Sequence, residues 1–548
     1  MKKFVLLIGI FGSSLFLYSQ SSTFEAVYNI VQNNCASCHI SGHESGLVLN
    51  GTISEVYDNL YDMTAHNPAA AAANKKIVFP GDPYKSFFFS KINNGLAIDV
   101  TLKAGEGTSC PKDTFTIENK EIEMVRQWII YGAFETGEYV DEELIATFYE
   151  VGGIQSVPSP PAAPAVEEGF QIHYGPYFLK PEDEHEYWSK FSTELTEDIE
   201  VKKLDVVMGD YSHHYIIEKY DAPTHYLNPF GLRTEDPEFL GVTLVTANQY
   251  SDVLELPEKT AFSWGTDTWL DLNSHYINYS SEFPIACEVY INVYTQPAGI
   301  ALYEMHADLP ANYDIYIPND NTPHTFEQTI RDPGNNDEIF IWGLTSHTHK
   351  YGDDYDVYMR TPDGDRGEKI FDASCGATNG IPGCVDEIYD YQHPPIRYWD
   401  TFLPVVADDG IIHEATFIND GDEPVSFGMT SDDEMMLIIY FYIDDTTGLN
   451  LPVAAALENT PVEDFTIDVF PNPAQDVFYA GIDGLENTPL SVELIDLTGK
   501  ITFSDTYEMI SVSPAVIKLE RNGLPSGIYM IKIADTKGNS VSRKILFQ

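Results

Sequence analysis

The feature that most constrains the fold is the composition of the region from Phe170 to about residue 445. There the chain is a series of short runs rich in Tyr, Val, Ile, Phe and Thr, separated by Pro, Gly and Asp. β-Branched and aromatic residues favour strands, and the separating residues favour turns. We therefore predict an all-β region. The whole chain has 548 residues, 43% of them hydrophobic, which is enough for several cores.

A metal-binding pattern stands out within this region. In a strand, residues i and i+2 point to the same face, so His347 and His349 can chelate one ion. The thioether of Met435 is a candidate third ligand. Two imidazoles and a thioether favour a soft, redox-active ion, and copper(I) suits this set better than zinc, magnesium or calcium.

A second histidine group lies earlier in the same region. His213 and His214 are adjacent, and adjacent strand residues point to opposite faces, so both can bind one metal only at a bulge or a strand end. His275 offers a third imidazole from another predicted strand. Three such imidazoles would make an open copper site.

The N-terminal part carries a different motif. A predicted short helix over residues 22–31 leads into Cys35, Cys38 and His39, which form the Cys-x-x-Cys-His signature of covalent c-type haem attachment. Cys35 and Cys38 would form thioethers to the porphyrin, and His39 would be an axial ligand of the iron. A zinc half-site or a thiol-redox pair is the alternative, but the sequence has no partner Cys pair and no thioredoxin-like context.

This segment resembles small cytochrome c domains, on the haem motif, the run Phe79 to Phe88 and the predicted helix Asn119 to Gly132. The resemblance implies a small all-α, cytochrome c-like haem domain over residues 21–136. In that family a Met-Pro pair commonly supplies the second axial ligand, and here the corresponding pair is Cys110-Pro111. The distal ligand is therefore open, and the candidates are Cys110, Met63, Met124 and His66.

The order His-His, His, His-Thr-His and Glu-Met in the β region resembles the type II copper, ascorbate-dependent monooxygenases, the family of peptidylglycine α-hydroxylating monooxygenase and dopamine β-hydroxylase. The resemblance covers roughly residues 169 to 445. It implies two jelly-roll-like β domains, 169–299 and 300–448, whose coppers face one another across a solvent-filled cleft. The electron-transfer copper would be bound by His213, His214 and His275, and the catalytic, O2-binding copper by His347, His349 and Met435.

Three positions depart from the family pattern. Thr345 stands where the peptide-amidating enzyme has an arginine that holds a substrate carboxylate. A family disulfide beside the methionine ligand is missing at both ends, near Ala415 and Met436. Met436 and Met429 are further candidates for the sulfur ligand, and Met435 is preferred because it directly follows Glu434.

The last segment, residues 464–548, has alternating strand patterns with Gly-bearing turns, which predict a small β-sandwich. Its runs Val469 to Ala474, Val492 to Lys500 and Leu524 to Ile533 are similar to the C-terminal sorting domain of type IX secretion substrates. The resemblance implies recognition by the type IX secretion machinery, export through the periplasm and outer membrane, and release or attachment at the cell surface.

Other features agree with an exported protein. Residues 1–20 read as a cleaved signal peptide, and residues 137–168 and 449–463 read as linkers, the first of them rich in Pro and Ala. A formal charge of −55 excludes nucleic acid as a partner. Cys375 and Cys384 flank a turn-rich loop and are a possible disulfide. The sequence assigns no clear bonding state to Cys110 and Cys287.

The expected function is a secreted copper-dependent monooxygenase, an oxidoreductase that acts on paired donors and hydroxylates a C–H bond with O2. Its cofactors would be two copper ions and one covalently bound c-type haem, which would relay electrons. Its partners would be O2, an external reductant (ascorbate or a redox protein) and an unidentified small-molecule or peptide substrate. The alternative is a non-catalytic copper-binding or copper/haem electron-transfer protein at the cell surface.

Overall fold

The computed structural model divides the chain into two compact units, residues 1–452 and 453–548. The structure describes residues 22–111, 117–221, 224–234, 241–374, 389, 391, 394–428, 430 and 432–449 of the first unit. In the second unit it describes residues 466–470, 474–475, 477–483, 489–496, 501–507, 515–521, 523–525, 527–535 and 540–547. The predicted signal peptide lies outside the described residues, as do Cys375, Cys384 and Met429.

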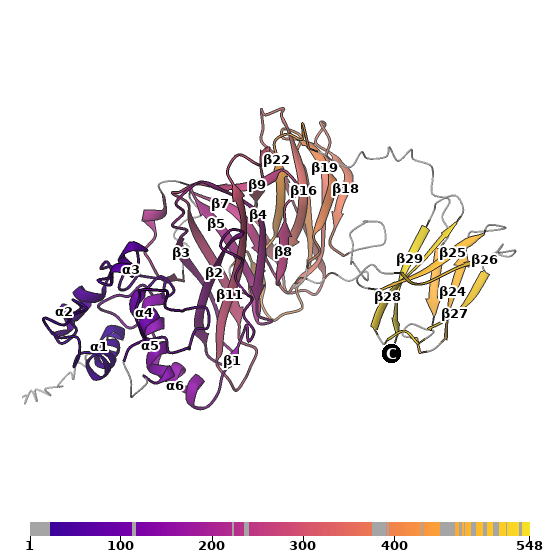
Figure 1. Ribbon diagram of the computed structural model, residues 1–548. Coiled ribbons are helices and arrows are strands. Elements are labelled where there is room, and N and C mark those ends of the chain that lie inside the picture. The colour runs from indigo at the N-terminus through magenta and orange to yellow at the C-terminus, as the bar shows by residue number, and fades with distance from the viewer. Residues whose placement is uncertain are drawn as a thin grey trace, which may run out of the picture. The chain divides into compact units, whose positions relative to one another are not determined.

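The described part of the first unit begins with helices (Figure 1). The Ser22 side chain caps the first helix, and Thr52 and Glu55 form a capping box at the second, so local sequence fixes where these helices begin. The helices are α1 (Thr23–Asn34), α2 (Ile53–Leu60), α3 (Pro68–Ala72), α4 (Phe87–Ile92), α5 (Asn119–Ile130) and α6 (Glu142–Glu150).

Two sheets follow. The first contains β1 (Ile154–Gln155), β2 (Gly169–Leu179), β4 (Ile199–Met208), β8 (Asp252–Glu255), β9 (Thr260–Trp264), β11 (Ile285–Pro297) and β12 (Tyr303–Glu304). The second contains β3 (Glu184–Ser192), β5 (Ser212–Tyr220), β6 (Leu232–Arg233), β7 (Val242–Asn248) and β10 (Trp269–Ile277). Inward-facing side chains of both sheets form one core, as in a β-sandwich.

A second β region completes the unit. One sheet contains β13 (His306–Asp308), β16 (Glu338–His347), β19 (Arg397–Val406) and β22 (Leu437–Ile443). Another contains β15 (Pro323–Ile330), β17 (Gly352–Arg360), β18 (Arg366–Asp372) and β20 (Ile411–Ile418), and a short pair joins β14 (Tyr316–Ile317) to β21 (Val425–Ser426). The two larger sheets share a core that includes Ile341, Val357 and Ile438.

The two β regions do not have fully separate cores. Phe402 of β19 and Phe441 and Ile443 of β22 belong to the same buried cluster as Val289 and Ile291 of β11. The all-β prediction for this region agrees with its strands, but the sheets are joined by continuous packing. The two predicted jelly-roll-like domains are therefore parts of one compact unit.

The predicted separate, all-α cytochrome c-like domain is wrong. Described strands far outnumber helices, and the helices belong to the same compact unit as the sheets. Gln127 of α5 donates a hydrogen bond from Nε2 to the Pro176 carbonyl of β2 (2.7 Å). The His173 ring of β2 is stacked between Tyr84 and Tyr290, at centroid distances of 4.2 and 4.0 Å.

The segment predicted as a Pro/Ala-rich linker, residues 137–168, also packs against the sheets. It contains α6 and β1, and β1 pairs in parallel with β11. The Phe148 ring of α6 contacts the Phe178 ring of β2 edge to face, with centroids 4.9 Å apart. The burial of these apolar groups stabilises the packing of the helices on the sheet. The helices and the sheets therefore do not form the separate domains that the sequence predicted.

The second unit is a small β-sandwich of its own. One sheet contains β23 (Thr466–Phe470), β24 (Val477–Asp483) and β27 (Ala515–Glu520). The other contains β25 (Leu490–Asp496), β26 (Ile501–Tyr507), β28 (Gly527–Asp535) and β29 (Ser540–Phe547), and residues such as Phe478, Leu494 and Ile531 fill the core. Across both units, none of the described helices is long and apolar enough to span a membrane.

Candidate metal centre

Five histidines meet where β5, β10 and the end of β16 approach one another. All five are buried, each with at most 9% of its surface exposed: His213, His214, His275, His347 and His349. His214 of β5 lies directly opposite His275 of β10 in the antiparallel ladder. His347 is the last residue of β16, and His349 follows two residues later.

A β-bulge brings the adjacent pair His213 and His214 to the same place. In the β5–β10 ladder His214 pairs with His275, but the next partner of β10, Tyr276, pairs with Ser212, so His213 is the extra residue. A bulge bends the strand and redirects the side chain of the extra residue. This is the local irregularity that two neighbouring ligands on one strand require.

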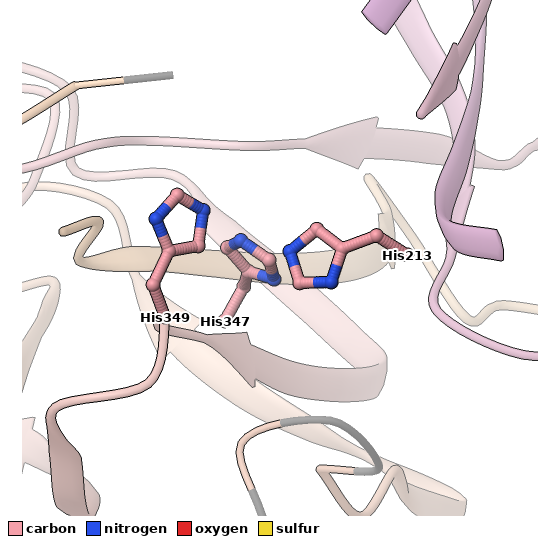
Figure 2. Close-up of side chains that lie close together, drawn as sticks. All are labelled: His213, His347 and His349. Carbon is pink, nitrogen blue, oxygen red and sulfur yellow. The ribbon is translucent and has the colours of Figure 1, made fainter. Parts of the chain in front are cut away.

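The two predicted ligand sets share one cluster. One ring nitrogen each of His213, His214 and His275 lies within 4.8 Å of the other two, and the same holds for His213, His347 and His349. Figure 2 shows the rings of His213, His347 and His349 gathered at one place. The ring centroid of His213 is 5.7 Å from that of His347 and 5.5 Å from that of His349.

This arrangement differs from the expected pair of coppers on either side of a solvent-filled cleft. His214 belongs to the first predicted set and His347 to the second, yet their ring centroids are only 6.0 Å apart. The continuous packing of the two β regions brings both sets into one buried cluster.

Neighbouring groups orient the imidazoles. Glu184 Oε1 lies 2.7 Å from His275 Nε2, and Glu186 Oε1 lies 3.0 Å from His214 Nε2. The Asp433 carbonyl lies 3.1 Å from His349 Nδ1. Each of these oxygens accepts the ring N–H, so the other ring nitrogen keeps its lone pair for a metal.

Several of the remaining nitrogens are buried without a partner. His275 Nδ1, His349 Nε2 and His213 Nε2 make no hydrogen bond with any described residue. A buried polar atom without a partner is costly unless something else satisfies it. Three such nitrogens in one cluster point to a ligand that accepts lone pairs.

The imidazoles are also held neutral. Burial, together with the neighbouring imidazoles, lowers the pKa of His213 and of His347 far below the usual value. Burial lowers the pKa of His275 as well, although Glu184 opposes the change, and it lowers the pKa of His349 to about 4. Near neutral pH these side chains are therefore uncharged donors, the form that binds metals.

The structure places the two described sulfur candidates in different surroundings. Met435, 5% exposed, lines a cavity together with His214 and His347. Met436 points the other way into the core, where Asn312 Nδ2 donates a hydrogen bond to its Sδ at 3.5 Å. Of these two methionines, Met435 is the one that lines the cavity beside the cluster.

Glu434 connects the two chain segments that carry His349 and Met435. It is fully buried and accepts hydrogen bonds from the backbone N–H groups of His349 (2.9 Å), Tyr351 (2.7 Å) and Met435 (3.1 Å). Burial raises the pKa of its carboxyl to about 7 against the effect of these bonds. Glu434 thereby fixes the turn after β16 to the segment before β22.

The cavity beside the cluster has a volume of about 170 Å³. Its wall is mainly apolar and comes from both β regions, with Trp188, Ile216, Leu309, Tyr313, Phe427 and Leu437. Its polar lining is Glu186, Glu218, Asn248, Gln249 and Asn273 besides the histidines. Among these described lining residues there is no Lys or Arg.

Copper fits this donor set. The cluster offers neutral imidazole nitrogens, three of them buried without partners, and a thioether lines the adjoining cavity. Imidazole suits copper, and a thioether favours its reduced state.

The carboxylates Glu184 and Glu186, which bond the histidines, were not predicted from the sequence. They are two residues apart on β3, and Glu186 is opposite His275, a relationship that only the strand register reveals.

The predicted haem segment forms one turn after α1. The backbone N–H groups of Cys38 and His39 both donate to the Cys35 carbonyl, each at 3.1 Å. The Leu47 carbonyl lies 3.3 Å from His39 Nδ1, which leaves Nε2 as the available ligand atom. Burial, and next the nearby Cys110 thiol, raise the pKa of Cys35 to about 12, so this thiol is protonated. These groups fit thioether attachment and one axial bond to a haem.

The candidates for the distal haem ligand differ in their burial and in their neighbours. Met124 of α5 is 5% exposed in the core of the helices, whereas Met63 is 44% exposed at the surface. Cys110 lies near Cys35, and the His66 ring lies against Gly46. No contact of the described residues singles out one of them.

Comparison with known proteins identifies one part of the chain. Residues 468–548 match the family model of the secretion system C-terminal sorting domain. No curated protein matches the sequence.

Solved structures give only weak likenesses. An immunoglobulin-like β-sandwich protein of the DUF3244 family from Bacteroides vulgatus is 13% identical with a TM-score of 0.13, over 16% of this chain and 95% of that one. CopC from Methylosinus trichosporium is 19% identical with a TM-score of 0.12, over 15% and 91%. A β-glucuronidase from Parabacteroides merdae is 10% identical with a TM-score of 0.16, over 42% and 30%. These scores support no argument about the whole chain.

The sorting-domain match agrees with the small β-sandwich of the second unit and with the motifs between Val469 and Ile533. Such a domain directs its carrier to the type IX secretion machinery. The predicted route is confirmed: residues 468–548 are a secretion system C-terminal sorting domain, and the protein is exported through the periplasm and outer membrane to be secreted or attached to the cell surface.

Proposed function

We propose that this exported protein is a copper-dependent monooxygenase that hydroxylates a C–H bond of a small substrate. The observation that carries the proposal is the cluster of five buried imidazoles beside a mainly apolar cavity lined by Met435. His213, His214, His275, His347 and His349 would hold copper, with Met435 as the sulfur ligand. Bound copper would supply one-electron redox chemistry and the activation of O2.

The overall reaction is balanced by an external reductant. A substrate R–H, one O2, two electrons and two protons give R–OH and one water. The electrons come from a reductant such as ascorbate or a redox protein. The protein's own groups hold the donors in place: Glu184 and Glu186 keep the ring protons of His275 and His214 away from the cluster, and Glu434 fixes the backbone at His349.

The cavity favours a particular substrate chemistry. Its described lining contains two carboxylates, Glu186 and Glu218, and no cationic side chain. Thr345, at the position of the family's carboxylate-binding arginine, donates its hydroxyl to the Pro395 carbonyl at 2.9 Å. A peptide ending in a free carboxylate would therefore find no partner here. A neutral or cationic, mainly apolar molecule is the expected substrate.

We also propose that Cys35 and Cys38 attach a c-type haem with His39 as an axial ligand. The two thiols and the imidazole share one turn, and His39 Nδ1 is occupied by a backbone carbonyl. A bound haem would supply a one-electron carrier on the same compact unit as the histidine cluster. Mass spectrometry of the exported protein should show one haem covalently attached, and Cys38→Ala should reduce the number of thioether links to one. An unmodified parent protein would refute this attachment.

Non-catalytic copper binding is the competing function. The observation in its favour is the burial of the cluster, because none of the five imidazoles is more than 9% exposed. A buried site restricts the access of O2 and substrate. Copper binding alone does not separate the two functions, since both require it.

Oxygen consumption separates them. Copper-loaded protein is mixed with ascorbate and a panel of phenylethylamines, glycine-extended peptides and small apolar compounds, and oxygen uptake is followed with an electrode. We expect substrate-dependent uptake that His349→Ala abolishes and His324→Ala retains. The His324 ring hydrogen-bonds Asp320 and Thr322, and its strand, β15, pairs with β20 in a different sheet from β5, β10 and β16. Uptake that no compound increases would favour non-catalytic copper binding.

A further inference from the structure

A row of carboxylates crosses the sheet formed by β15, β20, β17 and β18. Glu327 pairs with Glu414, Glu414 with Asp356, and Asp356 with Asp372, so four acidic residues are direct cross-strand neighbours. Asp354 lies two residues before Asp356 and so shares its face. Like charges opposite one another destabilise a sheet unless a counter-charge is present.

Two basic side chains neutralise part of this row. Arg366 bonds Glu327 through Nε at 2.9 Å and Glu414 through Nη1 at 3.2 Å. Lys369 Nζ lies 2.6 Å from Asp356 Oδ2 and 3.2 Å from Asp372 Oδ2. Five ionised carboxylates against these two cations would leave three negative charges on one sheet face.

The excess charge is concentrated at three residues. Asp354, Asp356 and Asp372 each present a carboxylate oxygen within 4.8 Å of the other two. Burial, and then the charges of Asp356 and Asp372, raise the pKa of Asp354.

Asp356 provides an independent sign of a ligand. Its side chain is buried, with 6% of the residue exposed, and its Oδ1 makes no hydrogen bond with any described residue. The other oxygen, Oδ2, already accepts hydrogen bonds from Lys369 and from the Tyr358 hydroxyl (2.8 Å). A buried carboxylate oxygen without a donor is costly, and a bound cation would satisfy it.

We propose that Asp354, Asp356 and Asp372 form a calcium site. The donors are all hard oxygens, which suit Ca²⁺ and not copper. Sites of this kind in extracellular modules bind calcium with dissociation constants of about 10⁻⁴–10⁻³ M. The export route of this protein leads to that environment.

Lys369 is compatible with such a site. Its side chain is 40% exposed, so the ammonium group can withdraw to solvent when a divalent ion arrives. In the absence of calcium, the singly charged Lys369 would be the counter-ion of Asp356 and Asp372, and a weaker one than a divalent ion. It therefore competes with calcium for Asp356 and Asp372.

The site would stabilise structure next to the histidine cluster. β17 begins at Gly352, whose N–H donates to the His349 carbonyl at 3.1 Å. Calcium bound between β17 and β18 would hold this hairpin at the chain segment that follows His349. The calcium site does not depend on the proposed copper chemistry, because its ligands are separate.

Calorimetric titration of the exported protein with CaCl2 tests the proposal, with the copper content held constant. We expect a dissociation constant in the millimolar range or lower. Thermal unfolding at saturating CaCl2 should show a rise in Tm of about 2 °C. Asp356→Asn should weaken binding at least tenfold, while Asp353→Asn, an exposed neighbour with the same change of charge, should bind like the parent. Lys369→Met should tighten binding.

Two kinds of result would overturn the inference. The first is equal weakening by Asp353→Asn and Asp356→Asn, or a Tm rise that NaCl of the same ionic strength reproduces, since either indicates general screening of the −55 charge. The second is calcium binding that Asp356→Asn leaves unchanged. If Asp356→Asn does not fold by circular dichroism, Asp354→Asn replaces it with the same criteria, because Asp354 is only partly buried.

Discussion

Glu434 offers a direct test of how the turn carrying His349 is held. Its carboxylate accepts hydrogen bonds from three backbone N–H groups, at His349, Tyr351 and Met435, and it is fully buried. Glu434→Ala removes all three acceptors. The N–H groups then remain buried without partners unless the turn opens to water.

The expected loss of stability follows from these bonds. A buried N–H that loses its acceptor costs about 2 kcal/mol, so three cost about 6 kcal/mol. The pKa of Glu434, about 7 against 4.5, is the net result of burial and these bonds, and it corresponds to about 3 kcal/mol against the ionised carboxylate at high pH. We therefore expect Glu434→Ala to lower the free energy of unfolding by about 3 kcal/mol, a large fraction of the usual total.

The same change should weaken metal binding. Removing a group that orients a metal ligand typically reduces affinity by about 10-fold to 100-fold. Chemical denaturation gives the stability and competitive titration with a copper chelator gives the affinity, with Glu423→Ala as an exposed control. The reasoning is refuted if Glu434→Ala unfolds at the parent's denaturant concentration and keeps its copper affinity within twofold.

Three further predictions concern charge and metal. Burial lowers the pKa of His413 from 6.5 to about 3, so its contribution to stability is complete above pH 6.5 and is lost as the pH falls toward 3. Between pH 7 and pH 4 the free energy of unfolding of metal-free His413→Asn, measured with urea, should therefore fall by about 3 kcal/mol less than that of the metal-free parent. Arg233→Met leaves Asp271 as an uncompensated buried charge and should cost about 3–5 kcal/mol by thermal unfolding, which Arg233→Met/Asp271→Leu should largely recover. Chelation of copper should lower Tm in the parent and have no effect in a variant that lacks His213, the imidazole common to the two groups of three clustered histidines.

The clustering of the histidines could be predicted in part because strand periodicity is local. The i, i+2 spacing of His347 and His349 and the bulge required by His213 and His214 follow from the geometry of one or two strands. The sequence preference for Met435 over Met436 agrees with the structure, in which Met435 lines the cavity and Met436 lies in the core. The roles of Glu184 and Glu186 could not be predicted, because they depend on which strand pairs with which and in what register.

In the helical part, the positions of helices could be predicted from the sequence, but their packing could not. α1 and α5 were predicted close to their observed positions, since caps and apolar spacing are local signals. Their packing was not predicted. The polar residues Glu123, Arg126 and Gln127 of α5 are all buried. Arg126 and Gln127 donate hydrogen bonds to the Glu123 carboxylate, and Gln127 also donates to the Pro176 carbonyl of β2.

The incorporation of oxygen from O2 into a product tests the proposed activity most directly. Copper-loaded protein, ascorbate and the substrate panel are incubated under ¹⁸O2, and the products are analysed by mass spectrometry. The proposed function predicts a product with one ¹⁸O atom, absent in His349→Ala and present in His324→Ala. Oxygen reduced only to peroxide or water, with no labelled product from any compound, would contradict it.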